Sequence, residues 1–449
     1  MISVTIKKGY DLNIKGKPSP DLEDLPKPEY VAALPEKIPF IIPRLLVEKG
    51  DKVKIGSLLF EDKRHPEVKF LSPGGGEITD IEFGPRRVVK AIVIRPDETE
   101  SFETFDSISE SDPEKIGREE LLHILLRRGV WPFIRELPFR DIAGTDKIPP
   151  AIFVTSDDGE PFQPDPAVYL KGKKELFEFG IRILSKLTKA VHVVAGADRR
   201  SAFPEELKQL ITHTCNGPYP AGDAGVILYH TKTASSENRS WYVCAQDVLT
   251  IAQSLKSGVY PVERVMVLAG SAATERKHIR TRAGVPLEHL IRGRVKTSDV
   301  RYVVGGIFRG YSAPKESYMG FYENSLTLLP ESKETQTFGF LSPGFKKPTY
   351  SRTFLSALSK SDLVMDCNLH GDLRACINCG VCAQVCPVDI LPQFAFKCVL
   401  ADEVEEFLEQ GLLDCAECGL CTYICPSKIE ICKILKDAKA KYYKEQGER

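Results

Sequence analysis

Short runs of alternating apolar and polar residues fill the first hundred positions of the chain. Between residues 40 and 96, runs such as LLVEKGDKVKIGSLLFED and VVKAIVI alternate in this way. They are separated by Gly-Asp, Gly-Ser and Ser-Pro-Gly pairs, which favour turns. This pattern predicts several short β-strands joined by tight turns.

Residues 1–110 therefore resemble a barrel-sandwich hybrid, the fold of biotinyl and lipoyl carrier domains. A carrier domain needs a modifiable lysine at an exposed hairpin tip. The segment DKRHPEVKF offers Lys63 and Lys69, but neither has the neighbours typical of a carrier lysine. We expect a scaffold with no carrier lysine.

The pattern changes to strands alternating with helices over residues 111–258. AIFVTSDD and AVHVVAGAD read as buried strands, and KELFEFGIRILSKLT has the apolar spacing of an amphipathic helix. This order predicts a Rossmann-like α/β layer. No GxGxxG follows these strands, so no dinucleotide site is assigned. The polar stretch CNGPYPAGDAG, residues 215–225, is either a binding loop or a structured turn.

Residues 259–330 return to strands and glycine turns. Their order, with RTRAGVPLEHLI as a helix opening, is typical of an SLBB-type β-grasp. Modules of this kind bind ligands or other proteins, and nothing in the sequence chooses between these uses.

The last part of the chain, residues 331–449, is predicted to be mainly α-helical. LPQFAFKCVLADEVEEFLEQGLL has apolar residues at helical spacing and a glycine near its end. The basic tail after Pro426 is a solvated helix face or a docking element for a membrane complex. The fold class predicted for the whole chain is therefore multidomain α+β, ending in a helical ferredoxin module.

Two nearly identical cysteine runs lie within residues 367–432. Both read CxxCxxCxxxCP, the pattern of bacterial ferredoxins with two [4Fe–4S] clusters, in which the cysteine before proline binds the other cluster. Cluster 1 would then be held by Cys376, Cys379, Cys382 and Cys425. Cluster 2 would be held by Cys415, Cys418, Cys421 and Cys386.

The rival interpretation is zinc, because CxxC pairs also build tetrahedral structural sites. Zinc needs only four ligands, however, and does not explain eight cysteines in two matching runs. Gly380 and Gly419 are expected where a side chain would crowd a cluster. His370, just before the first run, is the one histidine considered for tuning or ligation. The remaining cysteines are interpreted as small buried hydrophobic residues: Cys215, Cys244, Cys367, Cys398 and Cys432.

Composition narrows the functional classes. The 449 residues include 61 basic and 62 acidic side chains, so no global attraction to nucleic acid is expected. No signal peptide and no run of eighteen apolar residues is present, which predicts a chain without a transmembrane segment that stays in the cytoplasm. Disulfides are rare in that compartment, so clustered cysteines favour metal ligation.

Seven phrases spread over the chain carry a family resemblance. They are KKGYDLNIKGKP, GVWPFIRELPF, AIFVTSDD, GPYPAG, VMVLAG, RTRAG and YSRTFLSALSK. Together they resemble NqrA, the A-type member of the sodium-translocating NADH:quinone reductase, Nqr. The resemblance implies a peripheral protein on the cytoplasmic face of the bacterial inner membrane. It also implies the Nqr-type membrane partners NqrB to NqrF, electron transfer from NADH to ubiquinone, and a translocase of which this chain is one part.

The chain departs from that family in its intact cysteine runs, because familiar NqrA proteins keep only a degenerate remnant. Intact runs are typical of the related RnfC, an electron-transfer protein of the Rnf complex that works with NADH and ferredoxin. That relative carries a GGAGFPT loop, whereas this chain has RRGVWPFIRELPF. We therefore favour an NqrA-type protein that keeps an electron-transfer module.

Two functional hypotheses follow. In the first, both clusters relay electrons. In the second, the chain is a scaffold that binds quinone or its partners, and the clusters are structural. No catalytic residue is assigned in either case, because no triad or paired carboxylates stand out, and no residue is assigned to quinone.

Overall fold

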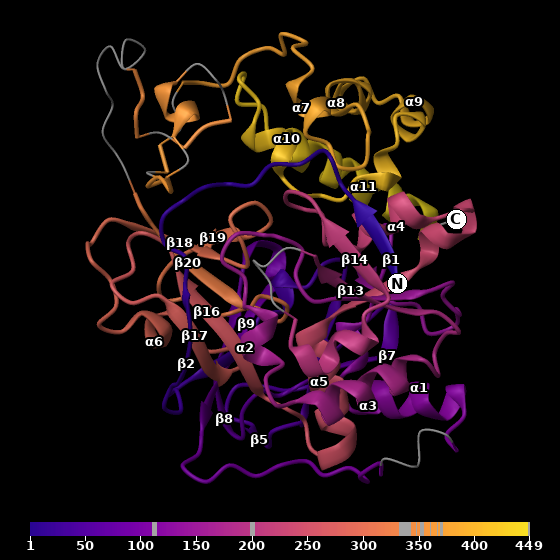
Figure 1. The fold of residues 1–449 in the computed structure, drawn as a ribbon. Coiled ribbons are helices and arrows are strands. Elements are labelled where there is room, and N and C mark those ends of the chain that lie inside the picture. The colour runs from indigo at the N-terminus through magenta and orange to yellow at the C-terminus, as the bar shows by residue number, and fades with distance from the viewer. Residues whose placement is uncertain are drawn as a thin grey trace.

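The computed structural model describes residues 1–109, 115–197, 203–331 and 371–447, with the shorter stretches 343–346, 348–350, 354–359, 361–365 and 367–368. Figure 1 shows the C-terminal helices gathered at one end of the molecule, beside β1 and β14. None of the helices within these stretches is long and apolar enough to cross a membrane.

A seven-stranded sheet forms the α/β layer, in the order β1–β14–β13–β12–β15–β10–β11. The first five strands are parallel, and the last two are antiparallel additions at one edge. Buried apolar side chains run along β12, as expected for a parallel strand covered on both faces. The strands are β1 (Ile2–Thr5), β10 (Arg135–Glu136), β11 (Asp141–Ile142), β12 (Ile152–Thr155), β13 (Val191–Gly196), β14 (His213–Asn216) and β15 (Trp241–Cys244).

Helices pack on this sheet and on each other. A Cβ at Gly180 would lie 2.4 Å from Val248 Cγ1, so the glycine lets α3 and α5 approach closely. Helix α4 packs on β1 and β12, on the side of the C-terminal helices. The helices of this layer are α1 (Arg118–Arg127), α2 (Pro166–Tyr169), α3 (Lys174–Leu184), α4 (Ala224–Thr231) and α5 (Ala245–Ser257).

A six-stranded sheet follows, in the order β19–β18–β20–β16–β17–β2. Its outer strand β2 comes from the N-terminal segment and pairs in parallel with β17. Strands β1 and β2 thus thread the beginning of the chain through both large sheets. The elements are β2 (Ser19–Asp24), β16 (Glu263–Ala269), β17 (Lys277–Arg282), α6 (Leu287–Ile291), β18 (Val300–Val304), β19 (Tyr311–Ala313) and β20 (Ser325–Pro330).

The short strands predicted for residues 40–96, together with the earlier strand β3, form two small sheets, β3–β9–β8–β5 and β4–β6–β7. Lys63 stands at the tip of the β6–β7 hairpin. Its neighbour Arg64 bonds Asp62 and, at 2.8 Å, Asp141 of the α/β layer, so the tip is tied down. The strands are β3 (Val31–Ala33), β4 (Pro43–Leu45), β5 (Lys52–Val53), β6 (Leu58–Asp62), β7 (His65–Leu71), β8 (Gly76–Phe83) and β9 (Val89–Pro96).

The C-terminal module consists of short helices around the cysteine runs. Helix α11 packs on α8 and α10, and a separate apolar core lies between them. The barrel-sandwich strands and the α/β layer, by contrast, share one core that includes Leu59, Trp131 and Val154. The helices are α7 (Val381–Gln384), α8 (Pro392–Leu400), α9 (Val404–Glu409), α10 (Leu420–Tyr423) and α11 (Ile431–Gly447).

Candidate iron–sulfur centres

The two cysteine runs have the same backbone conformation. When the runs are aligned so that Cys376 corresponds to Cys415, three later pairs of equivalent residues have backbone φ angles in the left-handed region. These pairs are Asn378 and Glu417 (φ 55° and 54°), Gly380 and Gly419 (71° and 77°), and Asp389 and Lys428 (54° and 59°). In each run the glycine is followed by a single helical turn, α7 or α10, that carries the third cysteine. The sequence repeat is therefore a structural repeat.

Hydrogen bonds join the start of the first run to the end of the second. Arg374 N donates to Ser427 O at 2.9 Å, and Ser427 Oγ donates to Ala375 O at 2.9 Å. These bonds flank Cys376 on one side and Cys425 on the other. The start of the first run and the end of the second therefore lie side by side, and a ligand set drawn from both runs, as predicted for cluster 1, needs this arrangement.

A small internal cavity brings together the cysteines predicted for cluster 2. Its lining contains Cys415, Cys418, Cys421 and Cys386, together with Cys382 and Cys432. Sequence reasoning assigned Cys432 to the apolar core, but its thiol accepts a hydrogen bond from Cys421, which lowers the pKa of Cys432 to about 7. No spacing rule points to Cys432, because it lies outside the repeat.

The cysteine runs can be compared with a single-ion site. Within the described residues, no group of three or more His, Cys, Asp or Glu side chains is arranged to hold one metal ion. The four thiolates of a cubane each bind a different iron, so they lie farther apart than the ligands of one zinc ion. The donor set of eight thiols in two matching loops fits thiolate-held iron–sulfur clusters.

The loop of the second run is held by three side-chain donors. Arg140 Nη2 donates to Ala416 O at 3.0 Å, Tyr219 Oη to Cys418 O at 2.9 Å, and Lys439 Nζ to Cys415 O at 2.9 Å. Each of these bonds fixes a peptide group of the loop, so the amide N–H of that peptide group is fixed as well. Thiolate-bound clusters are tuned by such amide donors.

The first run is more exposed than the second. Cys379 lies at the surface and the neighbouring Ile377 is 70% exposed, whereas Cys418 is buried. Lys439, which belongs to the basic tail, is only 2% exposed, so this lysine is part of the support for the second run. The two candidate centres thus differ in access to solvent.

A buried charged network lies beneath the second run. Asp223 accepts from Arg140 at 2.8 Å and pairs with Arg309 at 3.0 Å, and Arg309 also pairs with Asp158 at 2.5 Å. Burial opposes ionisation of Asp223, but the two guanidinium groups hold its pKa well below the usual value. The loop at residues 215–225, left open as a binding loop or turn, is thus a structured part of this junction.

Glu160 is buried in the same junction. Its carboxylate accepts a hydrogen bond from Phe308 N at 2.7 Å. Burial, with repulsion from Asp158, raises the pKa of Glu160 to about 7, although Arg309 opposes the rise. The unfolded chain therefore releases this proton at a lower pH than the folded chain does.

This difference predicts a pH-dependent stability. Between pH 4.5 and pH 7 the folded chain holds more protons at Glu160, so its free energy of unfolding falls as pH rises, by about 3 kcal/mol at most from this residue. Glu160→Gln keeps an acceptor for Phe308 and should remove that part of the slope. Urea titrations of the unaltered chain and of Glu160→Gln at pH 5 and pH 8 measure how the free energy of unfolding changes with pH. Equal slopes would contradict the assignment.

The two repeat glycines give a matched pair of variants. An alanine at either position is strained by its positive φ, at a cost of about 1–2 kcal/mol. At Gly380 the added Cβ meets nothing within 4 Å, but at Gly419 it would lie 2.7 Å from Phe308 O. The glycines are thus explained by backbone conformation, and at Gly419 also by Phe308.

We expect Gly419→Ala to lower the midpoint of urea denaturation more than Gly380→Ala, and to release iron from cluster 2. Urea denaturation with iron analysis of both variants measures these effects. Equal losses of stability in the two variants would show that the contact with Phe308 does not constrain this loop.

Among the other cysteines that were predicted to be buried, Cys215 is buried, whereas Cys244, Cys367 and Cys398 are only partly buried. Burial raises the pKa of the Cys215 and Cys244 thiols to about 12. His370 lies outside the described residues. The functional contacts missed by sequence reasoning are those of Arg140, Tyr219 and Lys439, which come from three distant segments.

Family models match four parts of the chain. They describe an NqrA N-terminal barrel-sandwich hybrid domain at residues 4–97, an NqrA second alpha/beta domain at 116–260, an NQRA C-terminal domain of the SLBB type at 265–314, and a 4Fe-4S binding domain at 371–391. These matches confirm the multidomain organisation and support an iron–sulfur region at the C-terminal end.

Curated relatives match nearly the whole chain. The A-type subunit of the Na(+)-translocating NADH-quinone reductase of Rhodopirellula baltica is 33% identical, with 92% of this chain and 91% of the relative covered. The proteins of the same name from Yersinia pestis and Shewanella amazonensis are 31% and 32% identical, with 92% of both chains covered. A solved NAD+-reducing [NiFe]-hydrogenase, 12% identical over 50% of this chain and 49% of that one, has a TM-score of 0.35, too low for a structural argument.

The resemblance found in the sequence phrases is therefore confirmed, both by the three NqrA domain matches and by relatives above 30% identity over most of their length. The chain belongs to the NqrA family, the A-type subunits of the Na(+)-translocating NADH-quinone reductase.

Proposed function

We propose that this chain is a peripheral subunit of a complex that passes electrons from NADH to quinone and exports Na+. Its place would be the cytoplasmic face of the bacterial inner membrane, with NqrB to NqrF as partners. Family membership supports this assignment. As part of the same proposal, the chain consists of four units, residues 1–110, 111–258, 259–330 and 331–449. The second unit is Rossmann-like, and the last is helical and ferredoxin-like.

We further propose that the chain binds two [4Fe–4S] clusters, held by the crossed cysteine sets, and relays electrons through them. The observation that carries this proposal is the matched backbone of the two runs, with the first run more exposed at Cys379 and the second embedded in a domain junction. Clusters held by thiolates exchange single electrons. Cys376, Cys379, Cys382 and Cys425 would form the centre that reaches the surface at Cys379.

The residues around the clusters have distinct roles in this proposal. Arg140, Tyr219 and Lys439 fix the carbonyls of the second loop, which orients its amides toward the sulfur atoms. The apolar core of the module, which includes Phe396 and Leu435, excludes water from the buried side. No side chain is assigned to proton transfer.

A redox titration tests the relay against a structural role. The chain is purified anaerobically and titrated with mediators while its EPR spectrum is followed. The relay requires both clusters to reduce reversibly at potentials between those of NADH and quinone. Clusters that resist reduction throughout that range would make the chain a scaffold whose clusters are structural.

A further inference from the structure

The carboxyl group of Glu160 is only half satisfied by hydrogen bonds. Its Oε1 accepts from Phe308 N, but its Oε2 is buried without a hydrogen-bond partner among the described residues. A Cβ at Gly306 would lie 2.8 Å from Oε1, so the glycine makes room for this group. A buried carboxylate oxygen without a donor is costly, because nothing replaces the water it has lost. Protonation of Glu160 removes that cost.

Two aromatic residues connect Glu160 to the second cysteine run. The rings of Phe308 and Tyr219 stack with their centroids 4.9 Å apart. Tyr219 Oη donates to Cys418 O at 2.9 Å, and Phe308 O would lie 2.7 Å from a Cβ at Gly419. Phe308 also binds Glu160 through its amide. One layer of packed residues therefore separates the carboxyl group from the loop of the second run.

The ionisable groups that face Glu160 are Asp158, Arg309 and the phenol of Tyr219. Arg309 is already shared between Asp158, at 2.5 Å, and Asp223, at 3.0 Å. Its charge therefore only partly offsets the burial of Glu160. Asp223 stays ionised beside two guanidinium groups, whereas Glu160 has a pKa of about 7 and can change its charge near neutral pH.

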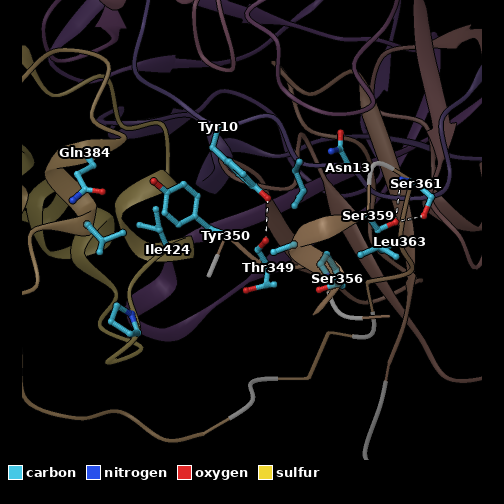
Figure 2. Close-up of a pocket in the computed structure, with 15 residues that line it drawn as sticks. Tyr10, Asn13, Thr349, Tyr350, Ser356, Ser359, Ser361, Leu363, Gln384 and Ile424 are labelled. Carbon is cyan, nitrogen blue, oxygen red and sulfur yellow. Dashed lines mark hydrogen bonds between the residues drawn. The ribbon is translucent and has the colours of Figure 1, made fainter. Parts of the chain in front are cut away.

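The other side of these aromatic rings has no comparable group. Tyr423 packs edge to face on Phe308 and stacks on Tyr10. Figure 2 shows Tyr10 beside Tyr350 in the lining of a cavity. None of the described residues that line this cavity is Asp, Glu, Lys, Arg or His. Of the two sides, it is therefore the one with Glu160 that holds a carboxyl group beside the rings.

We propose that Glu160 takes up one proton from solvent when the cluster of the second run accepts one electron. The extra negative charge lies in a buried region, where screening is weak, and so favours the neutral form of a nearby carboxyl group. The electron comes from the donor of the proposed relay. The proton leaves a hydronium ion and forms the O–H bond of the carboxylic acid. This inference rests on the proposed function and goes beyond it, because the relay itself involves no proton.

Redox titrations of the cluster-loaded chain between pH 6 and pH 8.5, followed by EPR, test the proposal. Well below pH 7 the proton is bound in both redox states, so the midpoint potential should be level. Above pH 7 it is bound mainly in the reduced state, so the potential of one cluster should fall as pH rises. We expect at least about a threefold fall in the equilibrium constant for reduction, which is about 28 mV for a one-electron couple.

Two variants locate the proton. Glu160→Gln keeps an acceptor for Phe308 N and should abolish the fall in potential. Glu430→Gln removes an exposed carboxylate of the same C-terminal module and should keep it. A pH indicator in weak buffer gives a second measurement on the unaltered chain. Reduction by methyl viologen radical, which releases no proton, should take up at least about a quarter of a proton per chain at pH 7 and almost none at pH 5.5.

Three results would overturn the proposal. Reversible reduction at potentials that do not vary with pH, or without proton uptake, would refute it and leave the relay. A fall in potential that persists in Glu160→Gln would place the proton on another group, such as His230, whose Nε2 lies 2.7 Å from Pro387 O. Clusters that resist reduction would refute the relay, and this inference with it.

Discussion

Replacing Cys386 with serine is expected to remove about half of the iron, roughly four of eight atoms per chain. Cluster 1, to which the other three cysteines of the same run belong in our proposal, should remain intact. The reason is the crossed arrangement that we propose for the ligands. Cys386 lines the cavity with Cys415 and Cys418 of the second run. Iron and acid-labile sulfide analysis of the purified variant measures the loss.

Double variants decide whether the ligands cross. Cys386→Ser combined with Cys415→Ser should lose no more iron than either single variant, because both residues serve cluster 2. Cys386→Ser combined with Cys379→Ser should remove nearly all iron, because both clusters are then affected. If each run held its own cluster, the outcomes of the two double variants would be exchanged.

Cys432→Ser is the control for the neighbouring thiol. Cys432 lines the same cavity and accepts a hydrogen bond from Cys421. We expect the variant to keep its full iron content. Loss of about four irons in Cys432→Ser with none in Cys386→Ser would make Cys432 the fourth ligand of cluster 2.

Asp223→Asn is expected to lower the free energy of unfolding by about 3–5 kcal/mol, because Asp223 is buried and its loss leaves the partly buried cations Arg140 and Arg309 without their shared carboxylate. Asparagine keeps an oxygen to cap α4, where Asp223 accepts from Gly225 N and Val226 N. The loss therefore reports on charge rather than on the helix cap. Urea denaturation monitored by circular dichroism measures it.

A surface pair on the same interface provides the control. Lys232 and Asp414 are 2.6 Å apart and partly exposed. Asp414→Asn should cost less than about 1 kcal/mol, because solvent screens the pair. If Asp223→Asn costs no more than this control, the buried network does not stabilise the junction between the cysteine module and the rest of the chain.

The cysteine module was the most predictable part of the chain. Spacing alone identified the repeat, because three cysteines two residues apart require a tight turn at a fixed position. The positive φ of Gly380 and Gly419 agrees with that requirement. The short strands of residues 40–96 followed equally well from local alternation and turn residues.

Contacts between distant segments could not be predicted in this way. Strands β1 and β2 join two sheets formed mainly by much later residues. Local apolar patterns do not specify such partners. In the sequence, Arg140 is likewise one basic residue among many. Its contact with Ala416 O depends on the fold, because the two residues are far apart in the chain. Cys432 gives no signal, because it stands alone in the sequence.

Metal analysis of the anaerobically purified chain, with EPR during a redox titration, tests the central claim most directly. The account predicts about eight irons and eight sulfides per chain, with two magnetically interacting signals that appear and disappear reversibly. Zinc at the cysteine runs, or a folded chain without iron, would contradict it.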